Sequence, residues 1–185
     1  MIDLHSHILP GIDDGARSLD EALELARQAA ADGVTTIAAT PHVRSDYPTT
    51  AEQMESGVVA LRGELARAGI PVDVVHGGEL ALERLGELTD DDVRRFSFGQ
   101  SGRYVLLECP YFGSPLELVP AIKALLAGGL TPLLAHPERN PDVIERPERV
   151  AALVELGVLV QITAGSVVGD FGRPPRIAAG TCSVR

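Results

Sequence analysis

Histidine and carboxylate side chains recur at, or immediately after, the ends of the short apolar runs in this sequence. The residues concerned are His5, His7, His42, Glu79, Glu108 and His136. If these runs are parallel strands, their carboxyl ends share one face of the fold, and that face carries the active site in barrel-like α/β proteins. Imidazole and carboxylate groups together suit Mn, Fe or Zn. The pattern therefore predicts a site for divalent metal ions.

The spacing of the two histidines in His5-Ser6-His7 is itself suited to metal binding. Side chains two residues apart on a strand point to the same side, so both imidazoles can reach one ion. An isolated tripeptide of this kind is equally compatible with a structural role. The Asp13-Asp14-Gly15 segment that follows is typical of a turn, yet it also places Asp14 close enough in sequence to act as a further ligand. Both interpretations of Asp14 stay open.

Four other side chains near these positions need an interpretation. Arg139 closely follows His136, and its planar guanidinium could clamp two phosphate oxygens, although a surface arginine at a helix end is the alternative. Glu138 is expected to support the ligands from behind or to face solvent. His76 is expected to end a strand rather than to bind a ligand. Cys109 is interpreted as a buried structural thiol.

Apolar periodicity predicts helices and strands in alternation. Helices are expected over residues 18–32, 50–68, 116–127 and 147–155, and strands over residues 34–39, 70–76, 104–108, 130–135 and 158–162. The first helix opens on a capping-box pattern, Ser18 to Glu21. Strands that alternate with helices predict parallel pairing and an α/β fold. Neither a repeat nor a linker is visible, so we expect one domain.

Composition excludes several classes of protein. The chain of 185 residues carries a formal net charge of −10, which disfavours binding to nucleic-acid phosphates. No apolar run approaches the roughly 20 residues that a membrane span requires, and the N-terminus lacks the pattern of a signal peptide. A cytoplasmic location without membrane insertion is therefore expected. The two cysteines do not indicate a disulfide framework. Nothing in the sequence indicates an oligomeric state.

The motifs together resemble the polymerase-and-histidinol-phosphatase (PHP) superfamily. Within it, the chain is most similar to the bacterial PHP-type protein-tyrosine phosphatases of capsule and exopolysaccharide synthesis. The similar segments are Met1 to Gly15, Thr40-Pro41-His42, Gly78-Glu79, Leu107-Glu108, His136-Pro137-Glu138-Arg139 and Thr163-Ala164-Gly165-Ser166. Each segment alone is unspecific, but their combination is specific and extends to about Gly172.

This resemblance implies a fold, a cofactor and a substrate. The implied fold is a distorted (β/α)7 barrel that holds three metal ions, usually Mn, with Fe or Zn as alternatives. The implied metal ligands are His5, His7, Asp14, His42, Glu79, Glu108 and His136. Arg139 matches a catalytic residue that stabilises the transferring phosphoryl group. The implied partner and substrate is a bacterial tyrosine autokinase that bears phosphotyrosine on its tail.

The sequence departs from the family's pattern after Gly172. The family's barrel ends with a further helix, a last strand and a Ser-Asp-Ala-His-like motif that supplies two more ligands, and no such motif follows His136 here. We therefore expect a PHP phosphatase domain over residues 1–172 that is C-terminally truncated and lacks its last strand and helix. Residues 173–185 are expected to form an irregular tail. Reduced stability and reduced activity would follow.

Three alternative functions stay open. An amidohydrolase barrel also begins with two histidines, but its bridging lysine would have to be Lys123, the sole lysine, which lies in a predicted helix. A histidinol-phosphate phosphatase would act on a small metabolite, whereas the opening Pro10 to Gly15 favours the tyrosine-phosphatase branch. A truncated remnant could bind metal without turnover.

Overall fold

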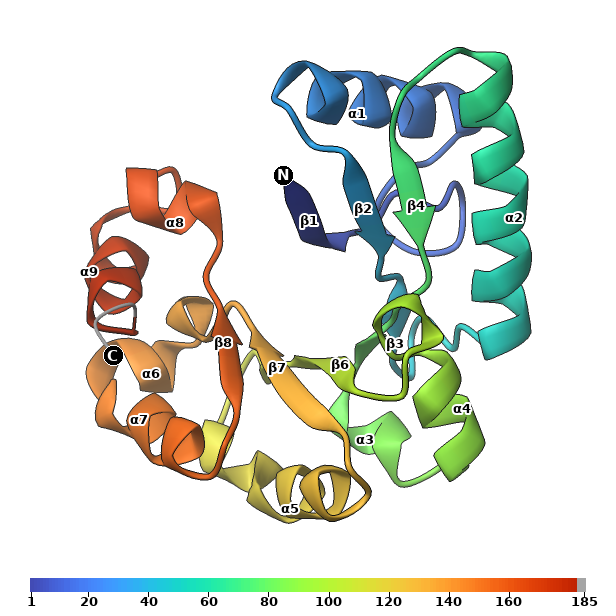
Figure 1. Ribbon diagram of the computed structural model, residues 1–185. Helices are drawn as coiled ribbons and strands as arrows, with labels where there is room; N and C mark the ends of the chain where they lie inside the picture. The colour runs from blue at the N-terminus through green and yellow to red at the C-terminus, as the bar shows by residue number, and fades with distance from the viewer. Residues whose placement is uncertain (183–185) are drawn as a thin grey trace. The chain divides into compact units, whose positions relative to one another are not determined.

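The computed structural model describes residues 1–182, in which helices alternate with parallel strands (Figure 1). The chain divides into two compact units, Met1–Leu106 and Leu107–Arg185. The division falls within strand β6 (Tyr104–Glu108). Over residues 1–182, no helix combines the length and the apolar character needed to cross a bilayer. The predicted α/β class with parallel strands is confirmed.

The first unit contains a sheet of three parallel strands in the order β1 (Ile2–Ser6), β2 (Thr36–Ala39) and β4 (Asp73–Val75). Parallel neighbours require a long crossover connection. Helices α1 (Leu19–Ala31) and α2 (Ala51–Arg67) lie in these crossovers, and α2 packs against both β4 and α1 (Figure 1). The fold of this unit therefore follows the strand–helix alternation of the sequence.

Side-chain caps begin both helices. At α1 the Ser18 hydroxyl accepts a hydrogen bond from the backbone N–H of Glu21, as predicted, but the Glu21 carboxylate accepts from Arg17 instead of completing the box. At α2 the box is complete, because Thr50 and Gln53 bond to each other's backbone N–H. Such caps satisfy N–H groups that the first helical turn leaves unpaired.

A second strand pair is formed by residues that closely follow β2 and β4 in the chain. Strands β3 (His42–Val43) and β5 (Glu79–Leu80) are parallel, and His42 is the register partner of Glu79. Helices α3 (Leu82–Leu85) and α4 (Asp90–Arg95) and the short 3₁₀ helix η1 (Phe98–Gln100) complete the unit. The sequence analysis did not predict these elements, since a strand of two residues is too short to show periodicity.

The second unit is built on the parallel pair β7 (Thr131–Ala135) and β8 (Leu159–Gln161). Its helical elements are η2 (Pro115–Leu118), α5 (Val119–Ala127), η3 (Pro137–Arg139), α6 (Pro141–Glu145), α7 (Glu148–Glu155), α8 (Ala164–Val168) and α9 (Arg173–Cys182). Helix α9 packs on α8, α6 and η3 (Figure 1).

The prediction of an irregular tail from residue 173 is wrong as far as residue 182. Residues 173–182 form α9, and Ala178 and Ala179 on this helix are buried. Pro174 and Pro175 lie in its first turn, where a missing N–H costs no hydrogen bond. Two adjacent prolines are therefore compatible with the start of this helix. Residues 183–185 of the predicted tail lie outside the described residues.

Each unit has an apolar interior. In the first unit the fully buried large side chains include Ile8, Leu9, Ile37, Met54, Leu61 and Phe96. In the second they include Leu107, Leu118 and Ile122. Burying one such side chain contributes about 1.5–3 kcal/mol. These interiors support the strands and the loops that follow them, where the candidate site residues lie.

Candidate metal centre

His5 on β1 and His7, which directly follows this strand, converge as the HxH spacing predicts. His5 Nε2 and His7 Nε2 are 3.2 Å apart. Thr40, which directly follows β2, holds Ser6, the residue between the two histidines. The Thr40 hydroxyl accepts a hydrogen bond from Ser6 N–H at 2.9 Å, and Thr40 N–H donates a hydrogen bond to Ser6 O at 2.9 Å. The register of β1 against β2 also shifts between Asp3 and Ser6. This irregularity lies beside His5 and His7, whose imidazoles point toward each other.

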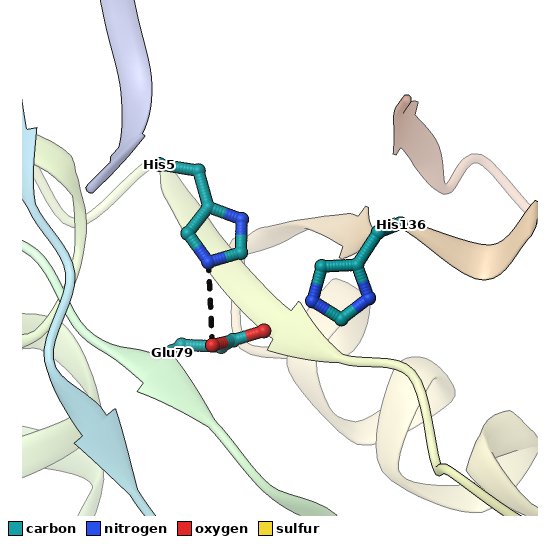
Figure 2. A group of neighbouring side chains, drawn as sticks. All are labelled: His5, Glu79 and His136. Carbon is teal, nitrogen blue, oxygen red and sulfur yellow. Dashed lines mark ion pairs between the residues drawn. The ribbon is translucent and has the colours of Figure 1, made fainter. Parts of the chain in front are cut away.

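A buried carboxylate lies where these imidazoles point. Glu79 Oε2 is 3.3 Å from His5 Nε2, an ion pair drawn in Figure 2, and 3.4 Å from His7 Nε2. His42 Nδ1 approaches the same oxygen at 3.1 Å. His7, His42 and Glu79 each offer a donor atom within 4.8 Å of the others. Three imidazole nitrogens around one carboxylate oxygen form a typical donor set for a divalent metal.

Asp13 holds His7 and His42 in place and was not predicted to do so. Its side chain is 0% exposed, and one of its oxygens lies 2.7 Å from His7 Nδ1. The same oxygen accepts from the backbone N–H of His42 at 2.9 Å, while the other accepts from Gly15 N–H at 3.0 Å. Binding at Nδ1 leaves His7 Nε2 directed at Glu79. Carboxylates that orient metal-bound histidines in this way are a recurrent feature of metal sites.

The contacts of Asp13 and His7 determine the charges of these two side chains. Burial raises the pKa of Asp13, but the hydrogen bonds from His7 and from the His42 backbone outweigh burial and hold that pKa below its ordinary value. Burial lowers the pKa of His7, yet its hydrogen bonds to Asp13 and Glu79 raise that pKa to about 10. In the metal-free protein His7 is therefore protonated and Asp13 ionised. A bound ion would displace the proton on the site side of His7.

His42 and Asp14 lie beside this cluster. Asp14 Oδ1 is 3.5 Å from His42 Nε2, and the Asp14 side chain is 54% exposed. The His42 ring stacks on Tyr47, with centroids 5.8 Å apart, and tilts against His7 at 4.4 Å. His7, Asp13 and Asp14 also offer donor atoms within 4.8 Å of one another. The first unit thus brings together all five ligands predicted for it, with Asp14 as the most solvent-accessible of them.

Two glycines allow the close approach of these segments. A Cβ at Gly15 would lie 2.1 Å from His7 O, and a Cβ at Gly78 would lie 2.5 Å from the Phe96 ring. Any side chain at these positions would push the Asp13 loop or the start of β5 out of place. Glycine is required here because backbone meets backbone or ring, rather than for an unusual dihedral angle.

The second unit carries the remaining predicted residues. Glu108 ends β6 and is buried. His136 follows β7 with φ 34° and ψ 49°, the left-handed region that non-glycine residues rarely adopt. Its N–H donates to Gln161 O on β8 at 2.8 Å. Backbone strain of this kind concentrates at functional sites, and here it turns the chain sharply at the end of a strand.

Glu138 and Arg139, which follow His136, have different environments. Glu138 is fully buried and accepts from Thr163 N–H and the Ser166 hydroxyl at 3.0 and 2.7 Å, so the expectation that it could face solvent is wrong. Arg139 is exposed, and its guanidinium lies 5.0 Å from the centre of the Phe171 ring. Within residues 1–182 no carboxylate pairs with Arg139. Glu138 therefore anchors α8, while the Arg139 guanidinium stays exposed beside Phe171.

Three further expectations concern residues away from the cluster. In the described part of the chain His76 belongs to no group of converging donors, and burial together with Arg62 lowers its pKa. Cys109 is a buried thiol, as predicted. Lys123 lies on helix α5 rather than on a strand. The arrangement of a lysine-bridged amidohydrolase is therefore not found here.

Parallel α/β units with a histidine–carboxylate cluster define a candidate metal-binding protein of the α/β class, and comparison with known proteins gives its family. The family model described as "Capsular polysaccharide synthesis, CpsB/CapC" matches residues 1–180. The chain belongs to the CpsB/CapC family.

Curated relatives carry the same kind of name. The chain is 36% identical to the tyrosine-protein phosphatase YwqE of Bacillus subtilis over 175 residues, which is 94% of this chain and 68% of the relative. It is 32% identical to the putative tyrosine-protein phosphatase CapC of Staphylococcus aureus over 93% of this chain and 68% of the relative. The tyrosine-protein phosphatase CpsB of Streptococcus pneumoniae is 28% identical, over 89% of this chain and 68% of the relative.

A solved structure supports the fold. It is described as one of the "crystal structures of YwqE from Bacillus subtilis and CpsB from Streptococcus pneumoniae, unique metal-dependent tyrosine phosphatases". The match has a TM-score of 0.87 and 36% sequence identity, and it covers 96% of this chain and 72% of the other. The similarity is therefore one of fold as well as of sequence.

Proposed function

We propose that this chain is a metal-dependent protein-tyrosine phosphatase of capsular polysaccharide synthesis. One observation carries the proposal: three imidazole nitrogens lie 3.1–3.4 Å from Oε2 of the buried Glu79 carboxylate. Family membership and the names of the relatives support phosphotyrosine as the substrate class. A histidinol-phosphate phosphatase and a catalytically inactive metal-binding protein are the less well supported functions.

The proposed ligands are those of the family pattern. They are His5, His7, Asp14, His42 and Glu79 in the first unit, and Glu108 and His136 in the second. Mn is the proposed ion, and the mixed nitrogen and oxygen donors are also compatible with Fe or Zn. The proposed barrel is a distorted (β/α)7 arrangement of the PHP type, for which the parallel strands and the likeness to a solved relative are the support.

The chain's own residues would contribute binding, orientation and charge. Divalent ions, when bound, lower the pKa of coordinated water and offset charge on phosphoryl oxygens. Asp13 holds His7 so that Nε2 faces the site. The exposed Arg139 guanidinium can donate two parallel hydrogen bonds to equatorial oxygens of a phosphoryl group, where negative charge develops in the transition state. Stacking on Phe171 restrains Arg139 before substrate binds.

A tyrosyl leaving group suits this set of residues. Tyrosinate has a parent pKa of about 10, so it departs more readily than an alkoxide and requires little proton donation. None of the predicted site residues is a dedicated general acid. Family membership supports the proposed partner, a tyrosine autokinase of polysaccharide synthesis that carries phosphotyrosine on its tail.

The test measures hydrolysis of a phosphotyrosine peptide and of p-nitrophenyl phosphate with added Mn²⁺, with and without EDTA. We expect activity that EDTA abolishes, and loss of activity in Glu79→Gln. The matched control is Glu145→Gln, which alters an exposed glutamate at the end of α6. Activity that survives the chelator, or a preference for histidinol phosphate over phosphotyrosine, would overturn the proposal.

A further inference from the structure

An exposed aromatic loop follows strand β6 in the second unit. We define it as residues 110–114, the stretch that follows Glu108 and Cys109 and ends before η2. Its Phe112 side chain is 85% exposed and its Tyr111 side chain 50% exposed. The whole chain has only three tyrosines, four phenylalanines and no tryptophan. The exposure of Phe112 beside a half-exposed Tyr111 is therefore not a consequence of an aromatic-rich composition.

The aromatic loop is held at both ends. At its end, the Ser114 hydroxyl accepts from Leu116 N–H at 3.3 Å, and Pro115 opens η2 in a buried position. Asn140 binds the loop backbone on both sides of Tyr111 and Phe112. Its Nδ2 donates hydrogen bonds to Pro110 O at 2.6 Å and to Gly113 O at 3.2 Å. The backbone below Tyr111 and Phe112 is thus fixed by a buried side chain, whereas Phe112 itself points into solvent.

Asn140 also connects the aromatic loop to the residue proposed to meet the phosphoryl group. Its Oδ1 accepts from the N–H groups of Asp142 and Val143, so the same side chain caps α6. Arg139 is the preceding residue, and consecutive Cα atoms are about 3.8 Å apart. The anchor of the aromatic loop therefore adjoins Arg139, and the loop begins only two residues after Glu108.

From this arrangement we infer that the aromatic loop recognises the aryl group of the substrate, with Phe112 as the specificity-determining side chain and Asn140 as its positioning residue. The inference rests on the proposed function. A phosphoryl group held by Arg139 would bring the rest of the substrate toward this loop, because the residue next to Arg139, Asn140, holds the loop backbone on both sides of Phe112. Offset or edge-to-face contact with a phenyl ring is the interaction that such a face favours. An alkyl phosphate or free phosphate would not use it.

The experiment compares aryl and non-aryl ligands in three variants. Phe112→Ala removes the aromatic face, and Asn140→Ser removes the Nδ2 donors while keeping a hydroxyl that can cap α6. Val59→Ala, which shortens an exposed apolar side chain on α2, is the control. For each we measure kcat and KM with a phosphotyrosine peptide, the inhibition constant of inorganic phosphate, and the sedimentation behaviour.

We expect Phe112→Ala to raise KM for the phosphotyrosine peptide about tenfold, the effect of losing one aromatic contact. Asn140→Ser should act in the same direction. In both variants the inhibition constant of inorganic phosphate should stay at the wild-type value, because phosphate lacks an aryl group. Val59→Ala should match the wild type throughout.

Other outcomes separate the two proposals. If the wild type does not hydrolyse phosphotyrosine, the proposed function fails and this inference fails with it. If the wild type is active and Phe112→Ala keeps its KM, the inference alone is overturned. The same holds if Phe112→Ala changes only the sedimentation behaviour, because the loop would then be a self-association surface. An equal loss of phosphate binding and peptide binding would also overturn it, by showing damage to the phosphoryl site instead.

Discussion

At the scale of single residues, two adjacent carboxylates have different environments. The Asp14 side chain is largely exposed, whereas the Asp13 side chain is buried and bonds to His7 and to the His42 backbone. The sequence placed a ligand in this pair but gave no reason to assign an orienting role to Asp13. The different burial of the two side chains determines their different roles. This burial depends on how the loop between β1 and α1 folds back on β1, which the local sequence does not specify.

We predict that Asp13→Asn weakens metal binding while the chain stays folded. An asparagine keeps the shape but loses the negative charge that orients and polarises His7, and changes of this kind typically cost roughly 10–100-fold in metal affinity. Titration of the metal-free protein with Mn²⁺ by calorimetry measures the effect. Asp20→Asn on the exposed first turn of α1 is the control. An Asp13→Asn affinity equal to that of the wild type would show that Asp13 is only structural.

For Arg139 we predict a loss in kcat that exceeds any rise in KM. The charge that its guanidinium meets develops mainly in the transition state, so Arg139→Ala should lower kcat on the order of 10²-fold. Arg139→Lys should recover little, because an ammonium group cannot form two parallel hydrogen bonds. Arg146→Ala, which removes an exposed arginine of an Asp142 ion pair, is the control. Steady-state kinetics with a phosphotyrosine peptide measure kcat and KM of each variant. An unchanged kcat in Arg139→Ala would show that Arg139 has only a structural role.

At the scale of elements, the loop between β1 and α1 depends on one glycine. A Cβ at Gly15 would overlap His7 O, whereas a Cβ at Gly63 on α2 would meet nothing within 4 Å. We predict that Gly15→Ala lowers the free energy of unfolding by roughly 1–3 kcal/mol through overpacking and also weakens metal binding. Gly63→Ala should instead raise it by roughly 0.5–1 kcal/mol, since alanine favours a helix interior. Chemical denaturation of both variants tests this pair, and equal effects would contradict the geometry of the loop.

Helices α2 and α4 are joined by charge at the surface. Arg95 on α4 pairs with Glu52 and Glu55 on α2. Hydrogen bonds from Arg95 hold the pKa of each glutamate below its ordinary value of 4.5. A lowered folded-state pKa means that the pair stabilises the fold above the unfolded-state pKa and loses this contribution as pH falls through the folded-state pKa.

We therefore predict that Arg95→Gln lowers Tm at pH 7 and that the difference from the wild type disappears on acidification below the pKa of both glutamates. The effect should be small, because these groups are exposed and solvent screens them. Arg27→Gln is the control, since its partner Glu24 lies on the same helix and the pair joins no two elements. Thermal unfolding across this pH range is the measurement. A difference in Tm that persists in acid would assign the loss to packing of the Arg95 side chain rather than to charge.

Much of the fold could be predicted because local signals and tertiary structure agree. The capped starts of α1 and α2 and the apolar run of β6 lie where residue types indicated them. The strands β3 and β5 could not be predicted, since pairing between distant segments, rather than propensity, makes His42 and Glu79 neighbours. Helix α9 was missed for a different reason. Its prolines are compatible with a first turn, and the burial of its alanines depends on the packing of α9 against other elements.

At the scale of the whole molecule, the chain combines a net charge of −10 with a cluster of buried carboxylates and imidazoles. An ion that binds only the folded state stabilises it, by about 2.7 kcal/mol at a concentration one hundred times Kd. For a chain of this size that corresponds to a rise in Tm of about 5–10 °C. We predict that Mn²⁺ raises Tm in this way and that EDTA reverses the rise.

The control must separate specific binding from general screening of an acidic protein. Glu79→Gln removes the carboxylate that the imidazoles share and changes the net charge by only one unit, so any general effect of cations on the acidic surface should remain. We expect Glu79→Gln to show little response to Mn²⁺, while sodium chloride at matched ionic strength should affect both proteins equally. Equal Mn²⁺ responses of wild type and Glu79→Gln would mean that the stabilisation arises from the acidic surface. The histidine–carboxylate cluster would then not be the metal centre.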